Sequence, residues 1–372
     1  MRERARSVLV VGAGMIGTSV AMALSERGHH VYLRDVDDDN LATAQHITRA
    51  PRHNGEHVDL AVAAVPPRHT GPVLAELLCE EVAAAVTDCA SIKSQPVQVT
   101  RALLARRPSD GHATAMSRYV GGHPLAGRER RGPRAARVDL FAGRPWVLTP
   151  HEESSDEAIG AAQWLVAECR ASTVIMTASE HDRAVAMTSH LAQIAASALA
   201  AQLENQDDHV LALAGQGLRD MTRIAGSDPE LWADIVAGNA GAVGDVLQRF
   251  SARLEDVIAA LRRSPDDAAD AVRAVMRSGR AGRQRMPGKH GESPRTYRAV
   301  PVVVPDERGQ MARLLADAAD AGVNIEDLRV DHAPGLPMGL IELYVASDSE
   351  ETLSRALAAR GWTLTSPGAD DT

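Results

Sequence analysis

Hydrophobic periodicity divides the chain into three regions. Through residue 176, unbroken apolar runs of strand length alternate with stretches in which apolar residues recur every three or four positions. From 177 to 261 only the helical period is present, and from 297 to 365 a strand-like alternation returns. Strands that alternate with helices are typical of a parallel sheet covered on both faces. The pattern predicts an α/β region, an all-helical region and a smaller region with a second sheet.

In the first region the expected strands alternate with the expected helices. Strands are predicted at 8–11, 31–33, 58–65, 83–86, 119–120, 145–148 and 172–176. Helices are predicted through Leu24, at 37–49, 71–82 and 96–107, and in a segment that ends at Arg170.

The first strand leads directly into the sequence G-A-G-M-I-G, which begins at Gly12. Gly12 permits a tight turn, Gly14 lets the backbone approach a pyrophosphate, and Gly17 lets the helix pack closely on the strand. The N-terminus of that helix offers N–H groups to phosphates, and Asp35, after the second strand, can bind an adenosine ribose. This arrangement predicts a Rossmann-type, doubly wound domain that binds NAD. Arg34, beside Asp35, leaves NADP open.

The helical region begins with Thr177 and Glu180, which have the spacing of a capping box. Its alanine-rich helices, such as 178–203, are longer than one sheet face can cover. They predict an interdigitated helical domain and a homodimer. A polar segment that contains glycine, 215–229, interrupts the helices.

The end of the chain predicts a linker and a third domain. Residues 277–295 are basic, rich in glycine and without periodicity, which is typical of a flexible linker. Beyond them the order of elements is βαββαβ, the ferredoxin-like unit. The predicted domains are therefore a NAD-binding domain at 1–176, a helical substrate and dimerisation domain at 177–276, a linker at 277–296 and a ferredoxin-like domain at 297–372.

Composition excludes several classes of protein. A net charge of −9 argues against nucleic-acid binding by the whole chain. No long apolar run predicts a membrane span, and the charged N-terminus leaves no room for a signal peptide. The three cysteines lack metal-site spacing, so we expect no metal, free thiols and a cytoplasmic location. Lysine is scarce: Lys93 and Lys289 are two of 40 basic residues. Lys93 is as consistent with a surface position as with a functional one.

Hydride transfer from an alcohol requires a base for the hydroxyl proton, and histidine suits neutral pH. His123 follows an expected strand, between glycine and proline, and Ser91 follows the neighbouring one. His181 lies eight and nine residues before Ser189 and His190 on one predicted helix, which we expect to place them on a shared face. The segment at 215–229 contributes Arg219 and Arg223, and the guanidinium fork suits a carboxylate substrate.

These residues lie in motifs that resemble the prephenate/arogenate dehydrogenase family of tyrosine biosynthesis, with a C-terminal ACT regulatory domain. The matching pieces run in order from residue 8 to 232: V-V-G-A-G-M-I-G, A-V-P-P, T-D-C-A-S-I-K, G-G-H-P-L-A-G, D-L-F-A-G-R-P-W-V-L-T-P, E-H-D-R-A-V-A-M-T-S-H-L and L-R-D-M-T-R-I-A-G-S-D-P-E-L-W. In the last part of the chain, A-G-V-N-I-E-D-L is similar to an ACT domain.

The resemblance implies a role for each site residue. His123 and Ser91 are the expected catalytic pair, and Arg223 is the expected clamp for the substrate carboxylate. The expected cofactor-binding residues are Gly12, Gly14, Met15, Ile16, Gly17, Asp35 and Pro66, and the other substrate-binding residues are His181, Ser189, His190, Gln193 and Arg219. An amino acid, with tyrosine as the expected effector, is predicted to bind the ACT domain at Gly309, Asn324 and Ile325; a purely structural domain is the alternative.

The family implies an NAD-dependent prephenate dehydrogenase, but one position departs from its pattern. Many members read S-H-L-P-H where this chain has Ser189-His190-Leu191-Ala192-Gln193. That change leaves arogenate, or a 4-amino analogue, open as the substrate. A β-hydroxyacid dehydrogenase would need a lysine on the helix after Thr177, and none is there. A regulator that senses NAD and an amino acid without turnover is a further alternative.

Overall fold

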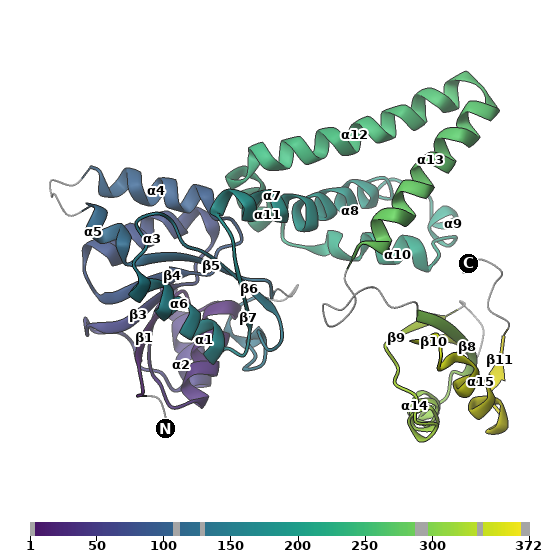
Figure 1. Ribbon diagram of the computed structural model, residues 1–372, viewed down its shortest axis with the longest axis horizontal. Coiled ribbons are helices and arrows are strands. Elements are labelled where there is room, and N and C mark those ends of the chain that lie inside the picture. Colours follow the sequence, from purple (N-terminus) through teal and green to yellow (C-terminus); the bar gives the residue numbers. More distant parts are fainter. Residues whose placement is uncertain (1–3, 107–111, 127–130, 287–296, 333–337, 366–372) are drawn as a thin grey trace. The chain divides into compact units, whose positions relative to one another are not determined.

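The computed structural model describes residues 4–106, 112–126, 131–286, 297–332 and 338–365. The chain forms two compact units, Met1–Ser251 and Ala252–Thr372, which are described separately here. Figure 1 shows the α/β region, the long helices and the second sheet.

A seven-stranded sheet forms the centre of the first unit, in the order β2-β1-β3-β4-β5-β6-β7. All neighbouring strands are parallel except β5 and β6. Every predicted strand of this region is confirmed, and β5 extends beyond its predicted end to include His123. The bounds are β1 Ser7–Val11, β2 His30–Arg34, β3 Val58–Ala63, β4 Ala83–Asp88, β5 Tyr119–Pro124, β6 Pro145–Thr149 and β7 Ser172–Ile175.

Helices cover both faces of this sheet, as a doubly wound fold requires (Figure 1). One face packs against α1 Met15–Glu26, α2 Asp38–Thr48 and α6 Asp156–Glu168. The other packs against α3 Pro67–Cys79, α4 Ser94–Leu104 and α5 His112–Ser117. The sequence pattern did not predict α5, because six residues are too few to show a helical period. Helix α3 begins earlier than predicted, with a proline in its first turn, a favoured position.

The strand order creates one topological switch point, between β1 and β3. From β1 the chain crosses to β2 on one side, and β3 then lies on the other side of β1. Ligands of open α/β sheets bind in the crevice at the carboxyl ends of the strands at such a point. The glycine motif follows β1, Asp35 follows β2, and Pro66 follows β3, so all three come at that edge.

The helical region begins at the predicted capping box. Thr177 Oγ1 accepts a hydrogen bond from Glu180 N at 3.2 Å, and Glu180 Oε2 accepts one from Thr177 N at 2.9 Å. The helices are α7 Ala178–Val185, α8 Leu191–Ala201, α9 Asp208–Leu211, α10 Gln216–Thr222, α11 Pro229–Gly238, α12 Ala240–Arg263 and α13 Pro265–Gln284. A π turn, Ala186–His190, joins α7 to α8, and a 3-10 turn, Arg223–Gly226, follows α10.

The segment Ala178–Ala201 is long and apolar enough to cross a membrane, by length and composition alone. The polar residues of this segment indicate a helix inside a folded domain instead. His181, Asp182, His190 and Gln193 are buried and hydrogen bond to other elements. Such contacts are typical of the core helix of a folded domain.

The predicted linker begins too early. Helix α13 continues to Gln284, although flexible chain was predicted from 277. Ser264 Oγ caps the helix by accepting a hydrogen bond from Asp267 N at 3.1 Å, and Arg283 lies in its last turn, where it complements the helix dipole. The rest of the predicted linker, 287–296, lies outside the described residues.

The C-terminal part of the second unit is a four-stranded antiparallel sheet in the order β11-β8-β10-β9. Its elements follow the predicted βαββαβ order: β8 Tyr297–Pro305, α14 Gln310–Asp320, β9 Asp327–His332, β10 Met338–Ala346, α15 Glu350–Ala359 and β11 Thr363–Leu364. A separate apolar core, which includes Val302, Leu314, Leu343 and Leu353, lies between this sheet and its two helices.

Candidate active site

The glycine turn after β1 has the geometry of a phosphate-binding loop. Gly12 has φ +105°, and a Cβ on it would lie 2.4 Å from the Ala64 carbonyl oxygen, so only glycine fits. A Cβ on Gly17 would lie 1.9 Å from the Gly12 carbonyl oxygen. A Cβ on Gly14 would meet no described atom within 4 Å. The turn is therefore closely packed at Gly12 and Gly17 and open at Gly14, where a pyrophosphate needs to approach.

The rest of this turn also fits a dinucleotide. Helix α1 starts at Met15 and Ile16 without a side-chain cap and without an acid in its first turn, so its N-terminal N–H groups suit an anion. Asp35 Oδ2 accepts a hydrogen bond from Ala13 N at 2.5 Å, which places the carboxylate beside the turn. Arg34 forms ion pairs with Glu76 and Glu80, at 3.3 and 3.5 Å, which favours NAD over NADP.

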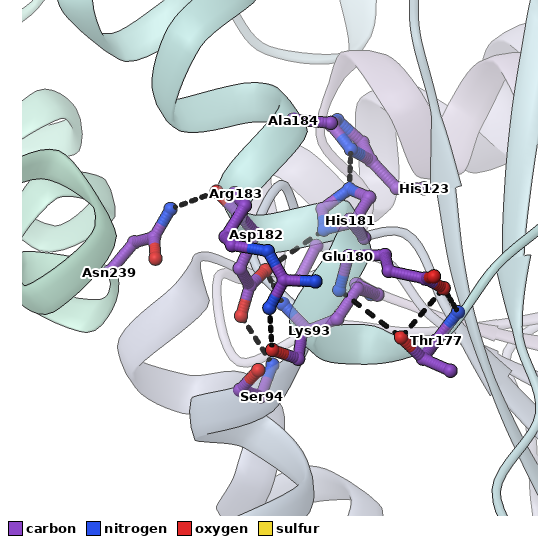
Figure 2. A network of polar contacts seen from close by, with 12 residues as sticks. Lys93, Ser94, His123, Thr177, Glu180, His181, Asp182, Arg183, Ala184 and Asn239 are labelled. Carbon is purple, nitrogen blue, oxygen red and sulfur yellow. Dashed lines mark hydrogen bonds and ion pairs between the residues drawn. The ribbon is translucent and has the colours of Figure 1, made fainter. Parts of the chain in front are cut away.

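His123, His181 and Asp182 form a chain of hydrogen bonds between β5 and α7 (Figure 2). His123 Nδ1 lies 2.8 Å from His181 Nε2, and His181 Nδ1 lies 2.9 Å from Asp182 Oδ1. His181 and Asp182 are buried, and His123 is half-buried.

This chain determines which nitrogen atoms carry protons. A carboxylate accepts hydrogen bonds, so His181 donates from Nδ1 to Asp182 and its Nε2 is an acceptor. His123 then donates from Nδ1 to His181. The lone pair of His123 is left on Nε2, which has no hydrogen-bond partner among the described residues. His123 is therefore oriented to accept a proton at Nε2.

Asp182 is held as a carboxylate at the N-terminus of α4. Its Oδ1 accepts a hydrogen bond from Lys93 N and its Oδ2 one from Ser94 N, both at 2.8 Å. Burial alone raises the pKa of Asp182, but the hydrogen bonds from His181, Ser94 and Lys93 outweigh burial and lower it. Asn239 Nδ2 donates to the Asp182 carbonyl oxygen at 2.8 Å and further fixes this turn of α7.

The surroundings of His123 disfavour its protonated form. Burial lowers the pKa of His123 well below its usual range, and the neighbouring His181, Lys93 and His190 lower it further; Asp182 acts in the opposite direction. Burial also lowers the pKa of His190, to about 4. His123 is therefore a neutral imidazole at physiological pH, the form that a general base requires.

Lys93 is not a surface residue. Its side chain is fully buried, where Nζ forms an ion pair with Asp88 and donates a hydrogen bond to the Gly122 carbonyl oxygen at 2.5 Å. Asp88 Oδ2 in turn accepts a hydrogen bond from Tyr119 Oη at 2.7 Å. The roles of Asp88 and Asn239 were missed in the sequence; the scarcity of lysine was the one signal that pointed to this cluster.

The other predicted residues are placed around this centre. Ser91 lies half-buried in the segment between β4 and α4 and makes no side-chain hydrogen bond with a described residue. His190 is buried, with Nδ1 3.3 Å from Asn239 Nδ2 and its ring nearly perpendicular to that of Trp232. Buried Gln193 donates to the Ile224 carbonyl oxygen at 2.9 Å, so it ties α8 to the 3-10 turn that begins at Arg223.

Three predicted substrate residues are exposed: Ser189, Arg219 and Arg223. No side-chain hydrogen bond or ion pair among the described residues joins Ser189 or Arg219 to His123. The structure therefore unites His123, His181 and His190 through Asp182 and Asn239, and it leaves the two arginines at the surface of this unit. The described residues contain no group of three or more histidine, cysteine or acidic side chains arranged to hold a metal ion.

The doubly wound sheet, the phosphate-binding turn and the oriented neutral histidine define an NAD-dependent dehydrogenase. Comparison with known protein families identifies the dehydrogenase family to which the chain belongs. "Prephenate dehydrogenase, nucleotide-binding domain" matches residues 20–175, and "Prephenate dehydrogenase, dimerization domain" matches residues 177–278. The chain belongs to the prephenate dehydrogenase family.

Individual relatives agree with this assignment. The chain is 34% identical to a Streptomyces niveus protein named "Probable prephenate dehydrogenase NovF" over 366 residues, which cover 96% of this chain and 99% of that protein. It is 26% identical to the prephenate dehydrogenase of Bacillus subtilis over 363 residues, which cover 94% and 95%.

Solved structures share the fold. The prephenate dehydrogenase of A. aeolicus, in complex with hydroxyphenyl propionate and NAD+, has a TM-score of 0.63 at 24% identity, over 75% of this chain and 98% of that one. The Synechocystis arogenate dehydrogenase has a TM-score of 0.60 at 24% identity, over 75% of this chain and all of that one.

Proposed function

We propose that this enzyme catalyses the NAD-dependent oxidative decarboxylation of prephenate to 4-hydroxyphenylpyruvate, with His123 as the base. The observation that carries the proposal is the hydrogen-bond chain from Asp182 through His181 to His123, which leaves the Nε2 lone pair of His123 free for a substrate hydroxyl. Ser91, which follows the neighbouring strand, is proposed to orient the same hydroxyl.

One base is sufficient for the proton transfers of the proposed reaction. Bound NAD⁺ supplies the acceptor for the hydride that leaves the hydroxyl-bearing ring carbon. The hydroxyl proton passes to Nε2 of His123, and His181 stabilises the resulting imidazolium because its Nε2 accepts the hydrogen bond from His123 Nδ1. The bond to the ring carboxylate then breaks, its electron pair completes the aromatic ring, and CO₂ leaves. His123 returns its proton to the phenolate oxygen, so the histidine ends neutral.

Binding is assigned to the residues around this chain. Arg223 is proposed to hold a substrate carboxylate through its guanidinium fork, with Arg219 one helical turn before it. His190 and Ser189 are proposed to line the pocket. A carboxylate grip that is equally strong in the ground and transition states lowers KM more than it raises kcat.

Gln193 favours a second candidate substrate. Many family members have a histidine at this position, whereas the Gln193 amide is engaged with the Ile224 carbonyl oxygen and Ser227. A neutral amide in place of a histidine changes how a keto or an amino side chain is held. The same chemistry on arogenate, or on a 4-amino analogue, is therefore the second candidate.

The C-terminal sheet is proposed to be a ferredoxin-like ACT domain that binds an amino acid. Its βαββαβ order and its own apolar core support this assignment. Gly309, with φ +87°, precedes α14, and the exposed Asn324 donates a hydrogen bond to Glu326 at 2.7 Å. Ile325 packs against the core and would contribute mainly its backbone. Tyrosine, the end product of the proposed pathway, is the proposed effector.

The helical region supports the proposal of a homodimer. The proposed biosynthetic pathway supports the proposal of a cytoplasmic location. The matching family domain is a dimerization domain. The long helices α12 and α13 expose large apolar side chains, namely Phe250, Leu254, Ile258, Leu261, Val272, Val275 and Met276. An apolar face of this kind marks a protein interface.

One assay tests the proposed function. NADH formation is measured with prephenate, with arogenate or with neither, and the product is identified by chromatography. Prephenate-dependent NADH with 4-hydroxyphenylpyruvate as the product is expected. Turnover with arogenate alone would select the second candidate, and no turnover with either would favour a regulator that does not catalyse.

A further inference from the structure

The geometry points to Lys93 as a positioning residue: it holds His123 and His181 at hydrogen-bond distance because it binds both of the segments that carry them. The inference deepens the proposed function and rests on it for the role of His123. Lys93 itself is fully buried, and its hydrogen bonds go to Asp182, Asp88 and Gly122. Its backbone contacts one segment, and its side chain contacts the other.

The backbone of Lys93 holds the helix that carries His181. Lys93 N donates to Asp182 Oδ1 at 2.8 Å, and the same oxygen accepts the hydrogen bond from His181 Nδ1. Asp182 therefore cannot move without breaking its contact with the N-terminus of α4. The position of the His181 ring thus depends on the position of Lys93.

The side chain of Lys93 holds the strand that carries His123. Nζ donates to the carbonyl oxygen of Gly122, the residue before His123, at 2.5 Å. Asp88, the ion-pair partner of Lys93, accepts a hydrogen bond from Gly122 N at 3.3 Å. Both backbone polar groups of Gly122 are thus bound by the Lys93–Asp88 pair.

The glycines before His123 make room for this arrangement. A Cβ on Gly121 would lie 2.4 Å from Thr149 Oγ1 and 3.4 Å from Lys93 Cδ. A Cβ on Gly122 would lie 2.5 Å from the Asp88 carbonyl oxygen. Larger residues would therefore displace β5 from its neighbours. The G-G-H sequence has a steric explanation at both glycines.

The chemistry of the site suits lysine better than arginine. The ammonium group is compact and directs its protons to Asp88 and the Gly122 carbonyl oxygen, whereas a guanidinium is planar and has five N–H donors to satisfy. Only two of the 40 basic residues in this chain are lysines, and one of them occupies this enclosed position.

The test compares Lys93→Met with two other variants in the full-length enzyme. Lys93→Met keeps the length of the side chain and removes the ammonium, but it leaves Asp88 as an unpaired buried charge. The double variant Lys93→Met/Asp88→Asn removes both charges and keeps an acceptor for Gly122 N, so it remains informative if the single variant does not fold. Thr100→Val is the matched control, because it removes a buried hydroxyl of α4 whose hydrogen bonds, among the described residues, go to the Gly71 and Pro96 carbonyl oxygens.

Both Lys93 variants should lose about 10²-fold in kcat, the size expected when a catalytic group is misplaced, with KM within about threefold of the native value. Thr100→Val should keep its kcat. In Lys93→Met the acid limb of kcat/KM should also move to higher pH, because the Lys93 charge lowers the pKa of His123; His181, His190 and Asp182 also face that ring and are unchanged. A folded Lys93 variant with kcat within about twofold of native would overturn the inference.

A second readout separates this inference from the proposed function. Imidazole ¹⁵N spectra report the protons on His123 and His181 whether or not His123 is the base. Altered signals for both rings in the Lys93 variants are expected, and unchanged signals would overturn the positioning role. If His123→Asn keeps its activity, the proposed function fails, and the spectra still decide whether Lys93 positions the pair.

Discussion

Burial lowers the pKa of His123 and of His190, and the effect on folding can be measured at His190. The pKa of His190 is lowered from 6.5 to about 4, chiefly by burial. Below pH 6.5 the unfolded chain binds a proton at His190 that the folded protein does not bind. This residue therefore destabilises the fold progressively from pH 6.5 to about 4, and adds no further loss below that pH.

Between pH 6.5 and about 4, the free energy of unfolding should fall further for the native enzyme than for His190→Gln. This additional loss should be at most about 3 kcal/mol. Urea unfolding at a series of pH values measures the difference. Because the variant keeps the carboxylates and the other histidines, it controls for their contribution to the pH dependence. Parallel curves for the two proteins would mean that His190 is not buried as a neutral ring.

At the scale of elements, the π turn between α7 and α8 places His190. Nine residues separate His181 from His190, and in an uninterrupted α-helix this spacing is two and a half turns, which puts the two rings on opposite faces. The π turn Ala186–His190 takes up about one extra residue. Both histidines are consequently buried, and Asn239 contacts both Asp182 and His190. Sequence spacing alone did not justify the shared face.

Deletion of Thr188 tests this role. Thr188 is exposed, and in the described part of the chain its hydroxyl donates only to the Ala184 carbonyl oxygen, in the last turn of α7. The shortened segment should become regular α-helix, in which His181 and His190 are eight positions apart and keep nearly the orientation that the π turn gives them. The kcat/KM should then stay within about threefold of the native value, with an unchanged helical circular dichroism spectrum. Thr188→Ala keeps the chain length and should be close to native. A deletion variant that folds but loses about 10²-fold or more in kcat/KM would contradict this account of the turn.

The sequence predicted the elements that are determined by residues close to one another along the chain. The glycine turn was predictable because Gly12, Gly14 and Gly17 meet steric needs within one βαβ unit, and Thr177 was predictable because its cap partner lies three residues away. Lys93 was not, because its burial depends on Asp88 and on Gly122, which comes from another strand. The π turn was not predicted, because its amino-acid composition does not distinguish it from an α-helix. Helix α13 was cut short because its glycines resemble a linker, whereas its N-terminal cap and closing arginines favour a helix.

At the scale of the whole molecule, the proposed ACT domain can be tested by itself, because residues 297–364 have their own core. Calorimetry of a 296–372 fragment, first shown to be dimeric, should give binding heat with tyrosine and little with phenylalanine. An enzyme truncated after Gln284, where α13 ends, should lose its response to tyrosine and keep its turnover. No heat with either amino acid, together with unchanged tyrosine sensitivity after truncation, would leave the domain purely structural.

The central claim is that His123 accepts the substrate proton, and His123→Asn tests it most directly. Asparagine preserves the size and polarity of the side chain and removes the base. With prephenate and NAD⁺, kcat should fall by about 10²–10⁴-fold while prephenate binding is largely kept, as expected when a general base is lost. A variant that retains near-native kcat would contradict the account.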